Sequence, residues 1–358
     1  MAGLFQVFFW LSRDNLVTLN ENSFEKIESL SYSPFEGYDK NLLSSEQIAY
    51  DVNLFENFTN KLRTYGTLEA YKILQSSKDS NLPIDLGLWI GGDLEANNLE
   101  IQRALEILKE YPNRIQSVIV GNEVLLRKEL EPLELYAYID FMKSHTKKPV
   151  TTAETWDIWE KNPQLASHVD FLTIHILPYW EKVPIERYNE FIIEKYSVVE
   201  ELFPNRKIVI GETGWPSHGY NNNSAIPSIK NQAQAIRGFV NLAHEKGWHY
   251  NIIEALDQPW KGYDEGNVGQ YWGIFTTDRA LKFQLAGEVE LNKYWLYQMI
   301  AAIIIGALLT LFGLKNQRVN ISHAFAYAIA AQGMAFGIVM AAIYPFVNYM
   351  NFGMWIMW

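Results

Sequence analysis

Eight short apolar runs recur between residues 27 and 261, and this repeat constrains the fold more than any other feature of the sequence. Each run is rich in β-branched residues and ends in a polar or glycine-marked turn, which is typical of buried strands. Most runs begin roughly 25–40 residues after the previous one, the length of a strand with its crossover helix. In chain order they read IESLSYSPF, NKLRTYG, DLGLWIGG, SVIVGNE, KPVTTAE, VDFLTIHILPYWE, KIVIGETGW and NIIEALDQPW.

The stretches between these runs have helical patterns. SSEQIAYDVNLFENF opens with a capping pattern, in which Ser44 precedes Glu46 and Gln47 in the first turn. NNLEIQRALEILKEY and NQAQAIRGFVNLAHE repeat apolar residues at helical spacing. Strand and helix alternating in this way predict an α/β fold, a (β/α)8 TIM barrel over residues 27–287. An open, doubly wound sheet is the alternative, although no GxGxxG motif follows the first run.

The segment 294–358 differs in kind from the rest of the chain. Residues 294–314 and 324–346 are apolar and carry no charge. At 1.5 Å per residue, each is long enough to cross a hydrocarbon core of about 30 Å. We therefore expect two C-terminal transmembrane helices, with two buried helices of a soluble bundle as the alternative. Gly333 and Gly337 form a GxxxG pair, which we expect to pack against the first span, self-association being the other interpretation.

The charge distribution predicts an orientation for these spans. Lys315 and Arg318 lie between them, and positive loops favour the cytoplasmic side of a membrane. The chain before residue 294 has a formal charge of 28 − 41 = −13, which disfavours nucleic acid as a partner. We expect a cell-membrane protein, embedded in the lipid bilayer, with its acidic domain on the periplasmic or extracellular side.

The N-terminal stretch, residues 1–26, shows no basic region and no small-residue cleavage site. Its apolar run, LFQVFFWL, predicts either a packed arm or the remnant of a larger membrane segment, as expected of a piece of a longer protein. The sequence contains no cysteine, which excludes disulfides and thiolate chemistry. The seven histidines lack metal-ligand spacing and no phosphate-binding glycine loop occurs, so neither a metal nor a cofactor is predicted.

Two of the apolar runs end in a glutamate. Glu123 follows SVIVGN, and Glu212 follows KIVIG. In a barrel the carboxyl ends of the strands open on one face, so residues 212 − 123 = 89 positions apart reach the same rim. A single glutamate at a strand end is explained equally well as a catalytic group and as a salt-bridge partner or helix cap. Two on one rim predict a catalytic pair.

A pair of carboxyl groups suits cleavage of a glycosidic bond. One donates a proton to the departing oxygen while the other acts at the anomeric carbon. A separation of about 5–5.5 Å leads to retention of configuration, and about 6.5–9.5 Å leads to inversion. We expect the proton donor to be the drier group, with a pKa raised by burial.

Aromatic residues gather near the predicted strand ends. Flat rings there can contact the apolar face of a sugar, although packing is the alternative for each one. As a group they predict a saccharide-binding surface made by Trp89, Tyr179, Trp180, Trp215, Trp260, Tyr271 and Trp272.

The segments VGNEVLLR, HILPYWE, IGETGWPSHG and EALDQPWKGYDEGNVGQYWGIF closely resemble the family 17 glycoside hydrolases. These are the retaining β-1,3-glucanases and their glucan-remodelling bacterial relatives, and the resemblance covers about residues 27–287. It implies that Glu123 is the acid/base and Glu212 the nucleophile. It also implies that Asn122 holds the 2-hydroxyl of the sugar. Further implied site residues are Arg63 and Tyr65 (an RxY element), the charged Asp257, Lys261 and Glu265, and the rim residues Tyr32 and His175, with a packed histidine as the alternative for the last.

The resulting hypothesis is a membrane-tethered, retaining enzyme that acts on β-1,3-glucan, as a hydrolase or a transglycosylase. It would remodel exported glucan, with a glucan synthase as a candidate partner. The alternative is a catalytically silent, membrane-anchored glycan-binding guide for such a synthase. A cytosolic metabolic barrel conflicts with the two predicted spans.

Overall fold

The computed structural model describes residues 2–11, 16–19, 26–292 and 294–348. The chain divides into two compact units. The first unit consists of the two ends of the chain, Met1–Asn20 and Gly287–Trp358, and the second unit is Glu21–Ala286.

The second unit is a closed barrel of eight parallel strands, which confirms the predicted fold class. Neighbouring strands around the barrel are consecutive in the chain, and the last strand returns to pair with the first. All eight predicted apolar runs contribute a strand. These are β2 (Leu30–Ser31), β5 (Leu62–Arg63), β6 (Ile84–Leu88), β7 (Ile115–Asn122), β8 (Val150–Thr155), β9 (Leu172–His175), β10 (Ile208–Thr213) and β11 (His249–Ile252).

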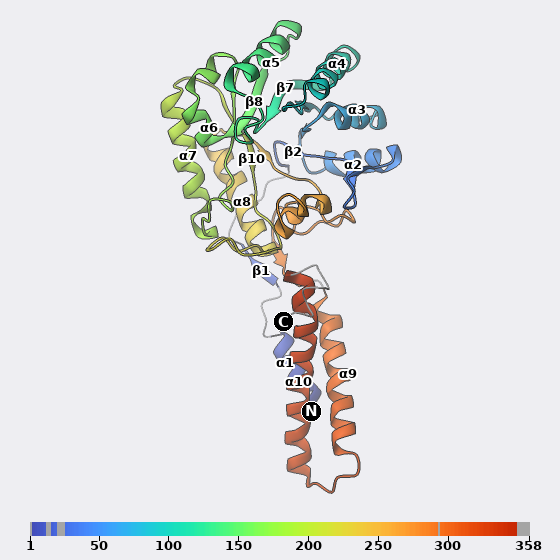
Figure 1. Ribbon diagram of the computed structural model, residues 1–358. Coiled ribbons are helices and arrows are strands. Elements are labelled where there is room, and N and C mark those ends of the chain that lie inside the picture. Colours follow the sequence, from blue (N-terminus) through green and yellow to red (C-terminus); the bar gives the residue numbers. More distant parts are fainter. Residues whose placement is uncertain (1, 12–15, 20–25, 293, 349–358) are drawn as a thin grey trace. The chain divides into compact units, whose positions relative to one another are not determined.

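Helices surround these strands, as Figure 1 shows. They are α2 (Ser45–Glu56), α3 (Thr67–Ser76), α4 (Leu94–Glu110), α5 (Pro132–His145), α6 (Trp156–Lys161), α7 (Tyr188–Leu202) and α8 (Ile229–Lys246). Side-chain caps begin several of them: the predicted cap Ser44 accepts the Gln47 N–H at 3.2 Å, and Asp93 and Ser228 cap α4 and α8 in the same way. Short 3-10 turns complete the loops at η1 (Pro163–Ser167), η2 (Ile185–Arg187), η3 (Pro259–Gly262) and η4 (Asn267–Tyr271), and a small hairpin is formed by β3 (Phe35–Glu36) and β4 (Asn41–Leu42).

The strands are buried because helices cover their outer face and side chains fill the barrel. All five residues of β6, for example, are buried. The eight strands run in the same direction, so their carboxyl ends meet on one face, which we call the mouth. Arg63, Asn122, His175 and Glu212 all lie in the last two positions of their strands and therefore at the mouth.

The other unit contains α1 (Ala2–Leu11), α9 (Trp295–Leu314) and α10 (Ile321–Asn348), together with a two-stranded ribbon of β1 (Leu16–Thr18) and β12 (Glu288–Glu290). The helix α1 packs against α9 and α10, with Trp10 buried between them. By length and composition, Trp295–Leu314 and Ile321–Ala342 could each cross a membrane.

Polar and small residues determine how these helices pack. The Gln6 side chain donates to the Gln332 carbonyl at 2.6 Å, and the indole of Trp10 donates to Gln6 at 3.1 Å. Gly306 lets the Gln332 side chain approach α9, because an added Cβ there would lie 2.5 Å from it. The prediction that Gly333 and Gly337 pack against α9 is wrong. A Cβ at either glycine would meet no atom of the described residues within 4 Å.

Candidate active site

Glu123 stands in a strained turn directly after β7. Gly121 and Glu123 both adopt the left-handed region, with φ of 83° and 55°. A side chain other than glycine is uncommon there and needs surrounding contacts to hold it. One such contact is the backbone N–H of Glu123, which donates to the Ala153 carbonyl on β8 at 2.7 Å.

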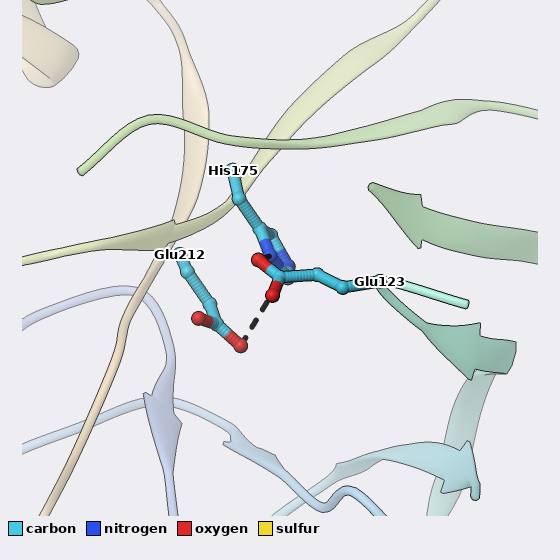
Figure 2. A group of neighbouring side chains, drawn as sticks. All are labelled: Glu123, His175 and Glu212. Atoms are coloured by element: carbon cyan, nitrogen blue, oxygen red, sulfur yellow. Dashed lines mark hydrogen bonds and ion pairs between the residues drawn. The ribbon is translucent and has the colours of Figure 1, made fainter. Parts of the chain in front are cut away.

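Glu212 lies near the end of β10, where the pairing with both neighbouring strands becomes irregular. Figure 2 shows its carboxylate and that of Glu123 pointing toward each other beside His175. One ligand-type atom from each of these three residues lies within 4.8 Å of the others. The structure therefore brings the two glutamates together, as their places at the ends of β7 and β10 predicted.

Arg63, at the end of β5, is the buried centre of this arrangement and is 2% exposed. Its guanidinium donates to the Gly211 carbonyl at 2.5 Å and to the Asn122 side chain at 2.7 Å. It also lies 3.5 Å from the Glu212 carboxylate. One arginine thus ties together residues from β5, β7 and β10, and so fixes Asn122 and Glu212 relative to each other.

The contacts of His175 determine its tautomer. Its Nε2 lies 3.2 Å from a nitrogen of Arg63, and a guanidinium can only donate. Nε2 is therefore the acceptor, and Nδ1 carries the hydrogen. Nδ1 lies 2.7 Å from the Glu123 carboxylate, so His175 donates to Glu123.

The environment of Glu123 differs from the expectation for the proton donor. Its side chain is 22% exposed and that of Glu212 is 7% exposed, so Glu123 is the wetter of the two. Burial raises the pKa of Glu123, but the hydrogen bond from His175 and the charges of Arg127 and Arg63 outweigh it and hold this pKa below its ordinary value. The expectation of a drier donor with a raised pKa is therefore wrong for Glu123. The sequence could not show that His175 donates to Glu123.

The spacing of Glu123, His175 and Glu212 would also suit a metal ion. However, Nδ1 of His175 donates to Glu123 and Nε2 faces Arg63. A cation placed here would also meet the guanidinium charge, which lies 3.5 Å from Glu212. These contacts favour an organic reaction centre over a metal site.

A second charged group lies beyond β11. Lys261 forms an ion pair with the buried Glu254 at 2.5 Å. Burial raises the pKa of Glu254 to about 7, although the charge of Lys261 opposes it, and the charges of Glu212 and Glu265 raise it further. Burial also raises the pKa of Glu265, against the charge of Lys261, and the charges of Glu212 and Glu123 add to the rise. Lys261 and Glu265 are thus electrostatic neighbours of the catalytic candidates.

The remaining member predicted for this charged group, Asp257, lies elsewhere. It pairs with Lys282 at 2.7 Å and accepts the Gly273 N–H at 3.1 Å. Glu254, rather than Asp257, is the acid that pairs with Lys261 and lies near Glu212. The signal was present in the sequence, because Glu254 follows the apolar run NII much as Glu212 follows KIVIG.

Four of the predicted rim aromatic residues present open or partly open rings, and one of them is Tyr271, which is half-buried with its ring 5.4 Å from that of His218. Trp89 is 46% exposed, and the Arg127 guanidinium lies 4.4 Å from its ring centre. Trp260 is half-buried beneath Lys40, at 4.3 Å. Trp180 is half-buried and stacks on Trp272 at 5.8 Å. These rings could contact a sugar.

The half-buried Tyr65 lies close to the charged centre. The Arg63 guanidinium lies 5.1 Å from the centre of the Tyr65 ring, and the Lys261 ammonium lies 5.9 Å from the same centre. Tyr65 therefore joins the two charged groups at the mouth, as the RxY element led us to expect of a residue lining the site.

Other predicted aromatic residues are core. Tyr179 and Trp215 are fully buried and meet edge to face at 5.7 Å, and Trp272 is also buried. Tyr32 is fully buried, where its hydroxyl donates to Asp51 on α2 at 2.8 Å. The structure does not bring these four rings to an open surface.

The comparisons with known proteins agree with this geometry. The family profile described as "BtgE/BtgC glycoside hydrolase domain" matches residues 29–273. The glucan 1,3-beta-glucosidase of Schizosaccharomyces pombe is 27% identical over 255 residues, which cover 66% of this chain and 79% of that protein. A btgC protein of Aspergillus niger is 28% identical over 276 residues, but the match spans only 40% of its length.

Solved structures are also similar to this chain. A family 17 beta-1,3-glucanosyltransferase from Rhizomucor miehei is 25% identical, with a TM-score of 0.64, and the match covers 71% of this chain and 94% of that one. An active-site mutant of the enzyme in complex with laminaritriose matches with a TM-score of 0.65.

Proposed function

Because the chain belongs to the BtgE/BtgC glycoside hydrolases of family 17 and is a glycosidase, we propose that it acts on β-1,3-glucan with retention of configuration. The observation that carries this proposal is the proximity of Glu123 and Glu212, within 4.8 Å. That proximity is consistent with the short carboxyl separation of retaining enzymes, about 5–5.5 Å, rather than with the roughly 6.5–9.5 Å of inverting ones.

In the first step, a Glu212 oxygen attacks the anomeric carbon and forms a covalent glycosyl ester. The bond from that carbon to the bridging oxygen breaks, and Glu123 gives its proton to this oxygen. Arg63 holds Glu212 in place, and Asn122 is positioned to bind the 2-hydroxyl of the same sugar. Attack from Glu212 inverts the anomeric centre once.

In the second step, Glu123 removes a proton from the incoming hydroxyl group. That group belongs to water in hydrolysis, or to a second glucan in transfer, and its oxygen displaces Glu212. The second inversion restores the original configuration. The relatives named glucosidase and glucanosyltransferase support both outcomes for the same carboxylate pair.

Glu123 must hold a proton before it can donate one. The N–H of His175 favours the ionised form of Glu123. Two carboxylates this close disfavour ionisation of both, and a sugar that excludes water strengthens this effect. We infer that Glu123 takes up its proton as the substrate binds.

The proposed activity is tested by the products from a single oligosaccharide. The protein in detergent is incubated with laminarihexaose, and the products are separated by length. Shorter products support glycosidase action, and products longer than six units identify transfer. Only shorter products would exclude transfer as the main activity. An unchanged hexaose, in the presence of a Glu212→Gln control that behaves in the same way, would contradict the proposal.

We further propose that α9 and α10 anchor the enzyme in a cell membrane. Their length and composition support this, and Lys315 and Arg318 in the connecting loop favour a cytoplasmic loop. The barrel would then lie on the periplasmic or extracellular side, where a glucan synthase could supply its substrate.

The absence of cysteine makes this topology directly testable. A single cysteine introduced at Asn316, in the loop, is expected to resist a membrane-impermeant thiol reagent in intact cells. A cysteine at the exposed Glu245 on α8 is the matched position, and it is expected to react. The reverse pattern would contradict the proposed orientation.

A further inference from the structure

Glu154, in β8, is a fully buried carboxylate with no assigned part in the reaction. One of its oxygens accepts the N–H of Leu125 at 2.8 Å, and the other lies 3.3 Å from the N–H of Leu126. Both donors belong to the turn that begins at Glu123. The carboxylate therefore reaches across from β8 to hold a loop of the neighbouring strand.

The strand β8 contacts this turn at two levels. The carbonyl of Ala153 accepts the N–H of Glu123, and the next residue, Glu154, accepts the two N–H groups further along. The segment is not a helix or strand, and Glu123 is held at a φ of 55°. A left-handed conformation of this kind is unfavourable for a residue with a side chain and persists only where surrounding contacts enforce it.

Burial opposes the charge of Glu154 and raises its pKa to about 7, while the hydrogen bonds from Leu125 and Leu126 lower it and the charge of Glu123 raises it. Burial of a carboxylate beside a second carboxylate costs more free energy than the closing of an ordinary turn requires. The burial of Glu154 is explained if the direction of the Glu123 side chain depends on Glu154.

We propose that Glu154 is a positioning residue, which holds the strained turn after β7 so that Glu123 can reach the bridging oxygen of the substrate. This inference rests on the function proposed above and deepens it. Glu154 does not touch the sugar. It acts through the backbone of Leu125 and Leu126, and hence through the geometry of Glu123.

The dependence on leaving group separates this role from a merely structural one. Proton donation matters for an unactivated glucan, whereas a 2,4-dinitrophenolate leaves without help. We expect Glu154→Ala to lower kcat/KM for laminarihexaose by about 100-fold, the usual cost of a misplaced catalytic group. For 2,4-dinitrophenyl β-laminaribioside, kcat/KM should change little.

The matched control is Glu69→Ala. Glu69 is also buried, its pKa is likewise raised by burial to about 7, and it accepts the N–H groups of Tyr65 and Gly66 at 2.7 and 2.8 Å. It holds a different loop, so any loss of kcat/KM should be equal for the two substrates. If Glu154→Ala also lowers both equally, or lowers neither, the positioning role is overturned.

Two further variants keep the result decisive. If Glu154→Ala does not fold, Glu154→Gln keeps the volume and one acceptor oxygen, and a smaller loss confined to laminarihexaose is expected. An equal loss for both substrates, or none, overturns the proposal here too.

Glu123→Ala is the reference for a missing donor. If it shows no dependence on leaving group, the donor assignment itself fails, whatever Glu154 does.

Discussion

Glu212→Gln is expected to abolish turnover of β-1,3-glucan while leaving binding nearly unchanged. Removal of a covalent nucleophile typically lowers kcat by at least about 10⁴-fold, since the remaining groups cannot form the glycosyl ester. Glutamine has nearly the same shape and still offers an oxygen toward Arg63, which lies 3.5 Å away in the wild-type protein. The measurements are kcat for laminarihexaose and its affinity by calorimetry.

A glycan-binding guide without catalytic activity would give a different result. It would bind laminarihexaose equally well in both forms and would turn over neither, so a wild-type protein without activity would favour the guide. Glu245→Gln, at an exposed position on α8, is the control for loss of one carboxylate. It should retain full activity. Turnover by Glu212→Gln close to the wild-type rate would remove Glu212 from the proposed mechanism.

Replacement of Arg63 is expected to damage both stability and activity. Arg63→Met leaves the Gly211 carbonyl, the Asn122 side chain and the Glu212 carboxylate without their common donor. Breaking a buried ion pair by removing one partner typically costs about 3–5 kcal/mol in the free energy of unfolding. Loss of alignment between Asn122 and Glu212 should lower kcat/KM by about 100-fold or more.

Arg63→Lys tests whether charge alone is sufficient. A lysine retains the charge but cannot donate in several fixed directions, so stability should recover partly and activity should stay low. Arg279→Lys is the matched control, because Arg279 makes a two-pronged pair with Asp51 at 2.9 and 3.0 Å, away from the glutamates. It should lose stability without losing kcat/KM. Wild-type activity in Arg63→Lys would contradict the organising role of Arg63.

The fold and the pair of glutamates could be predicted from sequence. The fold follows from the regular spacing of the apolar runs, and the pair follows from the common direction of the strands. Eight apolar runs at a regular interval specify parallel strands, and parallel strands specify a common mouth. Glu123 and Glu212 end two such strands, so their proximity follows without knowledge of any side-chain contact.

The finer errors arose where a side chain's direction decides its role. Tyr179 and Trp215 follow strands, as a sugar-binding ring would, but their loops turn these rings inward against each other. Tyr32 faces α2, where Asp51 accepts its hydroxyl hydrogen. Aromatic residues bury readily, so a place near the mouth does not predict an open ring.

The polar network was also beyond the reach of sequence patterns. Glu254, rather than Asp257, pairs with Lys261, and the sequence alone does not show which of two acids three positions apart will do so. Glu154 resembles any polar residue at a strand end until its contacts with Leu125 and Leu126 are known. The direction of the Glu123 pKa shift likewise depends on a hydrogen bond from His175, 52 positions along the chain.

The most direct test of the carboxylate pair is the configuration of the product at the moment it forms. Proton NMR, recorded during the first minutes of laminarihexaose cleavage by the protein, distinguishes the two anomers before they interconvert. With Glu123 and Glu212 oxygens within 4.8 Å, the new reducing end should appear as the β-anomer. An α-anomer formed first would mean that water attacks directly, and would contradict the double displacement on which the account depends.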